Sequence, residues 1–211
     1  QYSLINIHQT ESTITGDLVS QSSTIIDVEQ YEFPQMQNIN NLQFISNLSL
    51  TLKAETPDIL HLTITDNNNA NRWNPSSSLL NPKYLYDIKR SSSSLSEYGL
   101  TQLHNESFSF SILNPNNNTQ LIYTFSNDTF LFTDTFILFK SLLTSNNIYG
   151  FGERGHDFKL NYGIYTIWPN DTGGIQQDNG KGGMNGYGHQ PIGLHKPACS
   201  GVFLGFIFVN T

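Results

Sequence analysis

The residues best suited to chemistry lie between Ile148 and Pro191. The first part of this stretch, IYGFGERGHDFKLNYGIYTIW, is rich in aromatic residues and glycine and ends at Trp168. Asp171 follows, just before a glycine-rich segment, TGGIQQDNGKGGMNGYGHQP, that has almost no apolar content. An aromatic ring beside a carboxylate suits a sugar, whose face stacks on the ring and whose hydroxyls donate hydrogen bonds to the carboxylate. Because long glycine-rich loops in compact domains are often functional, we predict that Trp168 and Asp171 bind a substrate there.

Several other motifs in the chain are incomplete. Gly150–Gly155 matches G-x-G-x-x-G, but the residues after it indicate a strand instead of the helix that a dinucleotide site needs. Gly174–Lys181 has one residue too many for a phosphate-binding loop, and residues 66–71 lack the glycine of a calcium loop. The six histidines show no zinc-ligand spacing. We therefore expect neither a metal nor a cofactor.

Single residues near this stretch have simple structural interpretations. Glu153 and Arg154 are expected to form an ion pair that fixes a strand end. His189 is interpreted as structural, with a position near a ligand as the alternative. His61 alternates with apolar residues and should point away from the core. Cys199 is the only cysteine, and we expect it to be a small buried apolar side chain.

The composition excludes some functional classes. Charged residues make up 13% of the 211-residue chain, and the net charge is -7. A nucleic-acid-binding protein needs clustered Lys and Arg to neutralise phosphates, and no basic run occurs. The longest apolar stretch, Val202–Val209, is far shorter than the ~20 residues of a membrane span. The chain starts at Gln1 without a signal-peptide pattern, so we expect either a signal already removed or a fragment.

Five N-x-S/T sequons occur, although Asn, Ser and Thr are abundant enough for chance to give a similar number. We expect Asn170 to be unmodified, because a glycan there would crowd Asp171. The possible N-glycosylation sites are Asn47, Asn105, Asn117 and Asn127.

Short alternating strands dominate the pattern, which predicts an all-β, antiparallel sandwich or barrel. No 10–15-residue helical pattern separates them, and only the serine-rich loops at 76–80 and 91–97 could hold a short helical turn. Residues 1–30 alternate weakly and should add edge strands. Strands are predicted at 60–65, 108–112, 121–125, 130–139, 162–168 and 203–209, and turns at 66–69, 114–118, 126–128 and 145–147.

The chain shows no internal repeat and no domain boundary, so we predict a single domain over residues 1–211. Within it, residues 1–50 form poorly matched edge strands, and residues 169–191 form the loop of the substrate site. The chain ends directly behind its most apolar strand, and we expect a cut there by processing or design.

An ordered set of motifs resembles the N-terminal β-sandwich of family 31 glycoside hydrolases, the α-glucosidase, maltase and sucrase–isomaltase group. The resemblance extends over roughly residues 55–211. Upstream, Leu60-His-Leu-Thr-Ile-Thr-Asp66 is followed by Arg72-Trp73-Asn74-Pro75. The later motifs are Tyr149-Gly-Phe-Gly-Glu153, Tyr165-Thr-Ile-Trp168, Asp171, Tyr187-Gly-His-Gln-Pro191, and Gly201-Val-Phe-Leu followed by Val209-Asn210.

This resemblance implies a galactose-mutarotase-like sandwich that packs against a (β/α)8 barrel. The barrel carries both catalytic aspartates, and its W-x-D-M-N-E motif is absent here, so we expect no catalytic residue in this chain. The matching Asp171 would contact the sugar on the leaving-group side. The implied activity is that of a retaining α-glucosidase, which hydrolyses terminal α-linked glucose from maltose-type oligosaccharides. The barrel would lie on another polypeptide, and the compartment would be secreted or lysosomal/vacuolar.

Two features depart from the family pattern, and two alternatives remain open. Asn170 replaces the usual Arg before Asp171, and the segment 172–186 is longer than usual. Within the family, glucosidase II is the nearest competitor of the acid maltase type. Outside it, the alternatives are a non-catalytic carbohydrate-binding sandwich and a mutarotase-type epimerase, which would need a His/Glu acid–base pair.

Overall fold

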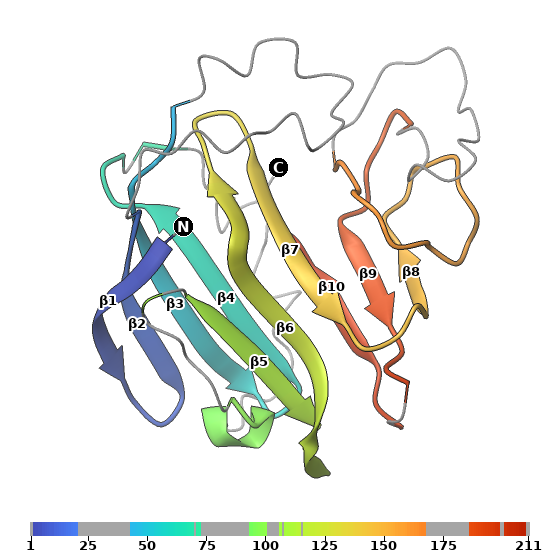
Figure 1. Ribbon diagram of the computed structural model, residues 1–211, viewed down its shortest axis with the longest axis horizontal. Helices are drawn as coiled ribbons and strands as arrows, with labels where there is room; N and C mark the ends of the chain where they lie inside the picture. Colours follow the sequence, from blue (N-terminus) through green and yellow to red (C-terminus); the bar gives the residue numbers. More distant parts are fainter. Residues whose placement is uncertain are drawn as a thin grey trace. The chain divides into compact units, whose positions relative to one another are not determined.

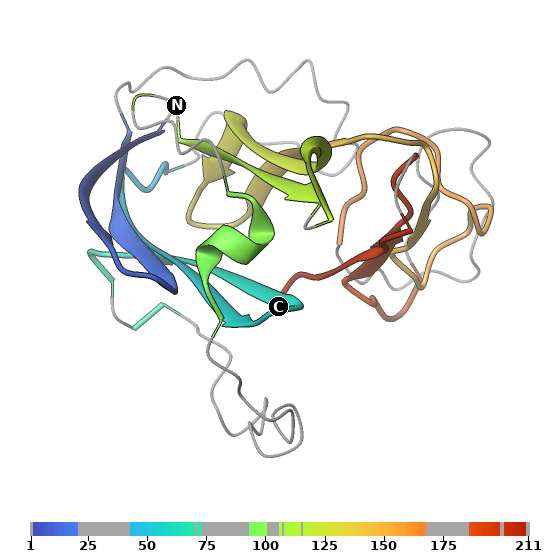
Figure 2. The same cartoon turned by 90° about the horizontal axis from the view of Figure 1, so that it is seen from below.

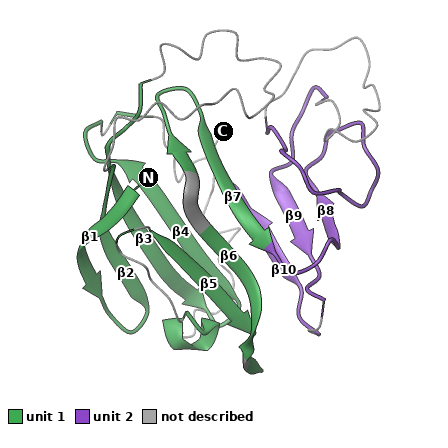
Figure 3. Cartoon of the chain, viewed as in Figure 1, with its two compact units in different colours: residues 1–73, 83–142 green, residues 74–82, 143–211 purple. Residues whose placement is uncertain are grey.

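The computed structural model describes residues 2–20, 43–69, 71–72, 93–100, 106, 108–114, 116–167, 186–198 and 201–209. These residues form β-strands and one short 3-10 helix (Figure 1). The chain divides into two compact units (Figure 3). Unit 1 contains residues 1–73 and 83–142, and unit 2 contains residues 74–82 and 143–211. The single domain expected over 1–211 stays a prediction.

Unit 1 contains two antiparallel sheets. The first has the order β1-β2-β3-β4, so β1 lies at an edge and β2 lies between β1 and β3. The second has the order β5-β6-β7. The strands are β1 Tyr2–Gln9, β2 Thr13–Ser20, β3 Asn47–Thr56, β4 Ile59–Asp66, β5 Ser109–Asn114, β6 Asn117–Phe132 and β7 Ile137–Leu143.

Strand β3 shows how the sequence builds the first sheet. Its residues alternate between buried and partly exposed along the whole strand, as expected for a strand with one face on the core. The neighbouring strand β4 follows the same period, and His61 is exposed, as predicted from its position between apolar residues. The alternation therefore fixes which face of the sheet is buried, because a shift of one residue would turn every side chain over.

The core of unit 1 lies between these two sheets, which form two layers (Figure 2). The first sheet contributes mainly aliphatic side chains, including Leu48, Leu50 and Leu52, and the second contributes phenylalanines. Phe110 and Phe125 stack with ring centroids 5.5 Å apart and an interplanar angle of 11°. The predicted all-β, antiparallel sandwich is therefore confirmed.

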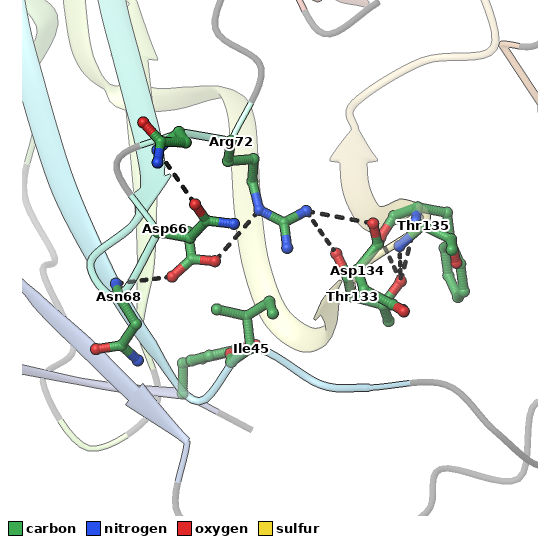
Figure 4. Close-up of polar contacts among 11 residues, drawn as sticks. Ile45, Asp66, Asn68, Arg72, Thr133, Asp134 and Thr135 are labelled. Carbon is green, nitrogen blue, oxygen red and sulfur yellow. Dashed lines mark hydrogen bonds and ion pairs between the residues drawn. The ribbon is translucent and has the colours of Figure 1, made fainter.

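A polar link joins the two layers near the ends of β4 and β6 (Figure 4). Arg72 Nε donates to the buried carboxylate of Asp66 at 3.2 Å, and Arg72 Nη1 donates to the backbone carbonyls of Thr133 and Asp134 at 3.3 Å each. The guanidinium carbon also lies 5.6 Å from the ring centroid of Phe132. Asp66 and Arg72 both belong to the sequence motif that runs from Leu60 to Pro75, of which residues 60–69 and 71–72 are described.

Two sequence-based predictions in the second sheet were wrong. Residues 130–139 do not form one strand, because β6 ends at Phe132 and a turn precedes β7. Thr133 makes that turn: its Oγ1 donates to Phe136 O and accepts from Phe136 N, both at 2.9 Å. The turn predicted at 126–128 is absent, since the backbone of β6 runs straight through it. Asx residues favour turns, but pairing within the sheet overrides that local preference here.

A short 3-10 helix, η3, spans Leu95–Tyr98 within the serine-rich segment where a helical turn was considered. Ser94 caps its first turn through its side chain, and Gly99 ends it in the left-handed region with φ 53°. Among the residues described, no helix is long and apolar enough to cross a membrane.

Phe125 lies at the centre of the aromatic layer, where its ring meets those of Phe108, Phe110, Phe130 and Phe139. Phe125→Ala should lower the free energy of unfolding by about 3–5 kcal/mol, because it removes a buried ring and leaves a cavity.

Urea unfolding of the chain would measure this loss. Leu121→Ala, on the same strand but 38% exposed, is the matched control and should change stability by less than about 0.5 kcal/mol. Equal losses for the two variants would contradict the described core.

Candidate functional site

The two predicted substrate contacts, Trp168 and Asp171, lie outside the described residues, as does Asn170. The structure does describe the chain on both sides of them, up to Ile167 and again from Gly186. These two flanks are therefore the part of the candidate site that the structure describes. Both belong to unit 2, whose antiparallel sheet has the order β10-β9-β8, with β8 Ile148–Gly150, β9 Ile192–His195 and β10 Leu204–Ile207.

The first flank is irregular, so the strand predicted over residues 162–168 was wrong as far as Ile167, where the description stops. Leu160 N donates to Ile148 O at 2.9 Å, and the bridge between Tyr149 and Lys159 is isolated. Pairing with β8 therefore ends before Tyr162. Alternating apolar residues predict a strand only where a partner strand is present to accept the backbone hydrogen bonds.

The segment after β8 has an unusual backbone. Gly150 has φ 117°, and a Cβ there would collide with the backbone of Ile192 on β9, so the position requires glycine. Phe151 has φ 54°, which is rare for a large side chain and normally persists only where packing enforces it. Here the Phe151 ring is buried, 5.8 Å from the ring of Phe206 and 6.0 Å from that of Phe208.

The aromatic packing in unit 2 depends on a second glycine. Gly193 on β9 pairs with Phe206 on β10, and the Phe206 ring occupies the space that a Cβ would take. The ring therefore lies over Gly193 and reaches Phe151, which belongs to the buried cluster with Ile148 and Leu160.

The backbone after Gly150 holds the second flank in place. Phe151 N donates to Ile192 O at 2.9 Å, and Gln190 N donates to Gly152 O. Gly186 N donates to Glu153 O at 2.9 Å. The chain re-entering from the glycine-rich segment is thus hydrogen-bonded along residues 186–192 to residues 151–153.

Arg154 holds the first flank. Its Nη2 donates to the backbone carbonyl of Thr166, and its guanidinium lies 5.6 Å from the ring centroid of Tyr165. Burial raises the pKa of Tyr165, while the charge of Arg154 opposes this increase. The expected ion pair between Glu153 and Arg154 stays a prediction. The hydrogen bond from the Arg154 side chain goes to the Thr166 carbonyl, and the Glu153 carbonyl accepts from Gly186 N.

Consecutive residues of one segment therefore hold both flanks of residues 168–185. Sequence reasoning identified Gly150–Arg154 as a motif but missed this role. The sequence carried a signal, since two glycines, Gly150 and Gly152, and the charged pair Glu153-Arg154 come just before an aromatic segment. It could not show which distant backbone groups these residues would meet.

Two histidines lie in the same flanks. His156 Nδ1 is 2.6 Å from Asp157 O, and its ring meets that of Tyr165 edge-on at 6.2 Å. His189 is partly buried in the second flank, and both its structural role and its position near a ligand stay predictions.

The comparison with protein families decides the family. Residues 49–205 match the glycosyl hydrolase 31 N-terminal galactose mutarotase-like domain, and this match covers most of both units. The chain belongs to this family. It is therefore a domain of a glycoside hydrolase, and its family implies a catalytic partner domain. Within the glycosyl hydrolase 31 match lie Asp66, Arg72, the Gly150–Arg154 segment and both flanks.

Arg154→Ala should release the first flank. A hydrogen bond from a charged donor contributes about 1.5–3 kcal/mol, so the backbone at Thr166 should detach at least about tenfold more often. Lys181 follows the first flank along the chain, and the rate of tryptic cleavage after Lys181 measures the release of this flank. Lys159→Ala, which removes a neighbouring exposed cation, is the control and should cleave at the wild-type rate. An unchanged rate in Arg154→Ala would contradict the anchoring role.

We expect His195 on β9 to make the stability of unit 2 depend on pH. Its side chain is fully buried, Nδ1 donates to Asn147 O at 3.3 Å, and Nε2 has no hydrogen-bond partner among the described residues. Burial lowers the pKa of His195, although the bond to Asn147 opposes the decrease. The unfolded chain therefore binds a proton first as the pH falls below about 6.5, and the folded state loses stability from there downward.

The test is denaturant unfolding of His195→Gln at pH values between about 7.5 and 5. The free energy of unfolding of wild type should fall relative to that of His195→Gln as the pH falls, because Gln does not titrate. His8→Gln, at an exposed histidine on β1, should follow the wild-type profile. A constant difference between wild type and His195→Gln would refute the prediction.

Proposed function

We propose that this chain is the N-terminal part of a retaining α-glucosidase. The substrate is a maltose-type oligosaccharide, and the reaction releases terminal α-linked glucose. The chain lends one loop, residues 169–191, to an active site completed by a catalytic barrel domain. The observation that carries the proposal is the family match over residues 49–205, which includes the segment with Asp171.

Asp171 has the role of a substrate contact in this proposal. Its carboxylate accepts hydrogen bonds from sugar hydroxyls on the leaving-group side of the scissile bond, and Trp168 offers a ring for stacking. The anchoring of both flanks supports this role, because a contact residue is effective only if the scaffold fixes where its loop begins and ends.

Catalysis itself belongs to the barrel. Retention of configuration requires two carboxylates about 5–5.5 Å apart, one as nucleophile and one as acid and base. The carboxylates in the described part of unit 2, Glu153 and Asp157, are both exposed. We therefore assign this chain binding and positioning, and no proton transfer or nucleophilic attack.

The proposal includes a secreted or lysosomal/vacuolar location. The low isoelectric point, about 5.2, supports it. In this location Asn170 would stay without a glycan, since a sugar chain beside Asp171 would occupy the substrate's space.

The test is the kinetics of the assembled enzyme with maltose. Asp171→Ala should raise KM and lower kcat/KM by roughly 10- to 100-fold, because a charged hydrogen bond to substrate contributes about 1.5–3 kcal/mol. Its thermal stability should remain at the wild-type value.

Asp178→Ala is the matched control, because it removes another carboxylate from the same stretch of sequence, at Asp-Asn-Gly. It should keep wild-type kinetics. Unchanged kinetics in Asp171→Ala would remove Asp171 from the site. A chain that stays monomeric and binds maltose without a partner would favour the carbohydrate-binding sandwich instead.

A further inference from the structure

We propose that Asn117 carries an N-linked glycan and that Asn47 does not. Both fit the N-x-S/T pattern, with Ser49 in one and Thr119 in the other, but the structure places them differently. This inference depends on passage through the secretory route and is independent of the substrate. Of the other candidates, Asn105 lies outside the described residues, and the side chain of Asn127 on β6 is not described.

Asn117 lies where the β5–β6 hairpin turns (Figure 1). Asn117 and Thr119 are both exposed. The hydroxyl of Thr119 donates to Asn117 Oδ1 at 2.7 Å, and the Thr119 N–H donates to the same oxygen at 3.2 Å. Both bonds use Oδ1, so neither engages Nδ2, the atom to which a glycan is attached.

The hairpin itself is well anchored. Asn114, which pairs with Asn117 across the turn, is buried, and its Nδ2 donates to Gln120 Oε1 at 2.7 Å. Its Oδ1 accepts from Asn116 N at 2.9 Å. These contacts lie on the protein side of the turn, so a glycan on Asn117 would extend into solvent without disturbing them. Glycans are bulky and belong on surface loops and turns.

Asn47 has a different environment. It begins β3, an internal strand of its sheet, where it pairs with Val19 on β2 and is only partly exposed. Asn67 Nδ2 donates to Asn47 Oδ1 at 3.0 Å and to Asp17 Oδ1 at 3.2 Å. Ser49 Oγ, the sequon hydroxyl, lies 2.6 Å from Thr65 Oγ1 on β4. These bonds leave Asn47 Nδ2 unused, but the Asn67 and Asp17 side chains stand beside the Asn47 amide on an internal strand, so a sugar there would meet protein groups where one on Asn117 meets solvent.

The modification needs a lipid-diphosphate-linked oligosaccharide as the donor. Asn117 Nδ2 forms a bond to the anomeric carbon of the first sugar, and the bond between that carbon and the diphosphate oxygen breaks. The lipid diphosphate leaves with the bonding electron pair, and the amide nitrogen loses one proton. No oxidation or reduction occurs.

Glycopeptide mapping of the intact protein, isolated from cells that produce it, tests the proposal. Enzymatic removal of N-glycans in water enriched in heavy oxygen converts each occupied Asn to a labelled Asp. Chymotryptic cleavage after Leu113 and Leu121 isolates the Asn117 sequon, and tryptic cleavage after Lys53 isolates the Asn47 sequon. We expect label at Asn117 and none at Asn47.

Label at Asn47, or none at Asn117, would overturn the proposal. Two variants expressed through the secretory route test the sequon hydroxyl. Thr119→Ala should abolish the label at Asn117, and Thr119→Ser should retain it. A label that survives in Thr119→Ala would contradict N-linked transfer at this sequon. Neither result depends on α-glucosidase activity, so failure here and failure of the proposed function are distinguishable.

Discussion

Hydrogen bonds from one short segment, Phe151–Arg154, hold both described flanks of the candidate site. Backbone groups of residues 151–153 hold the returning chain at residues 186–192, and the Arg154 guanidinium holds Thr166 on the outgoing side. The segment is itself fixed, because Gly150 can approach β9 only without a Cβ, and the buried Phe151 ring packs against Phe206. The loop that we propose to contact the sugar therefore starts and ends on a supported framework.

The motif residues that the structure describes each support their own unit. Asp66 and Arg72 join the two layers of unit 1, and Gly150–Arg154 joins two flanks in unit 2. In both motifs, most of these hydrogen bonds go to backbone groups. A domain that supplies one contact to an active site built elsewhere needs such support, since a loop misplaced by about 1 Å can cost 100-fold in rate. In the proposed function, such support lets this domain position one loop for a reaction that the catalytic partner domain carries out.

Sequence alone predicted the features that depend on local periodicity. The alternation in β3 and β4 gave the buried face and the exposed position of His61. It failed where pairing decides: β6 continues through a turn-like Asn-Asp sequence, and the apolar residues 162–167 form no strand. The Thr133 turn lies within a mostly apolar run, residues 130–139, for which one continuous strand was predicted. Contacts such as Arg154 to Thr166 could not be predicted, because a hydrogen bond to a backbone carbonyl leaves no residue-type signature on the acceptor.

The central claim is that this domain places the Asp171 carboxylate against the bound sugar. The most direct measurement is a structure of the assembled enzyme with an unreactive maltose analogue in its active site. We expect an Asp171 carboxylate oxygen within about 2.5–3.0 Å of a sugar hydroxyl oxygen, on the side away from the terminal glucose. A carboxylate turned away from the sugar, with both flanks still anchored as described, would contradict the account.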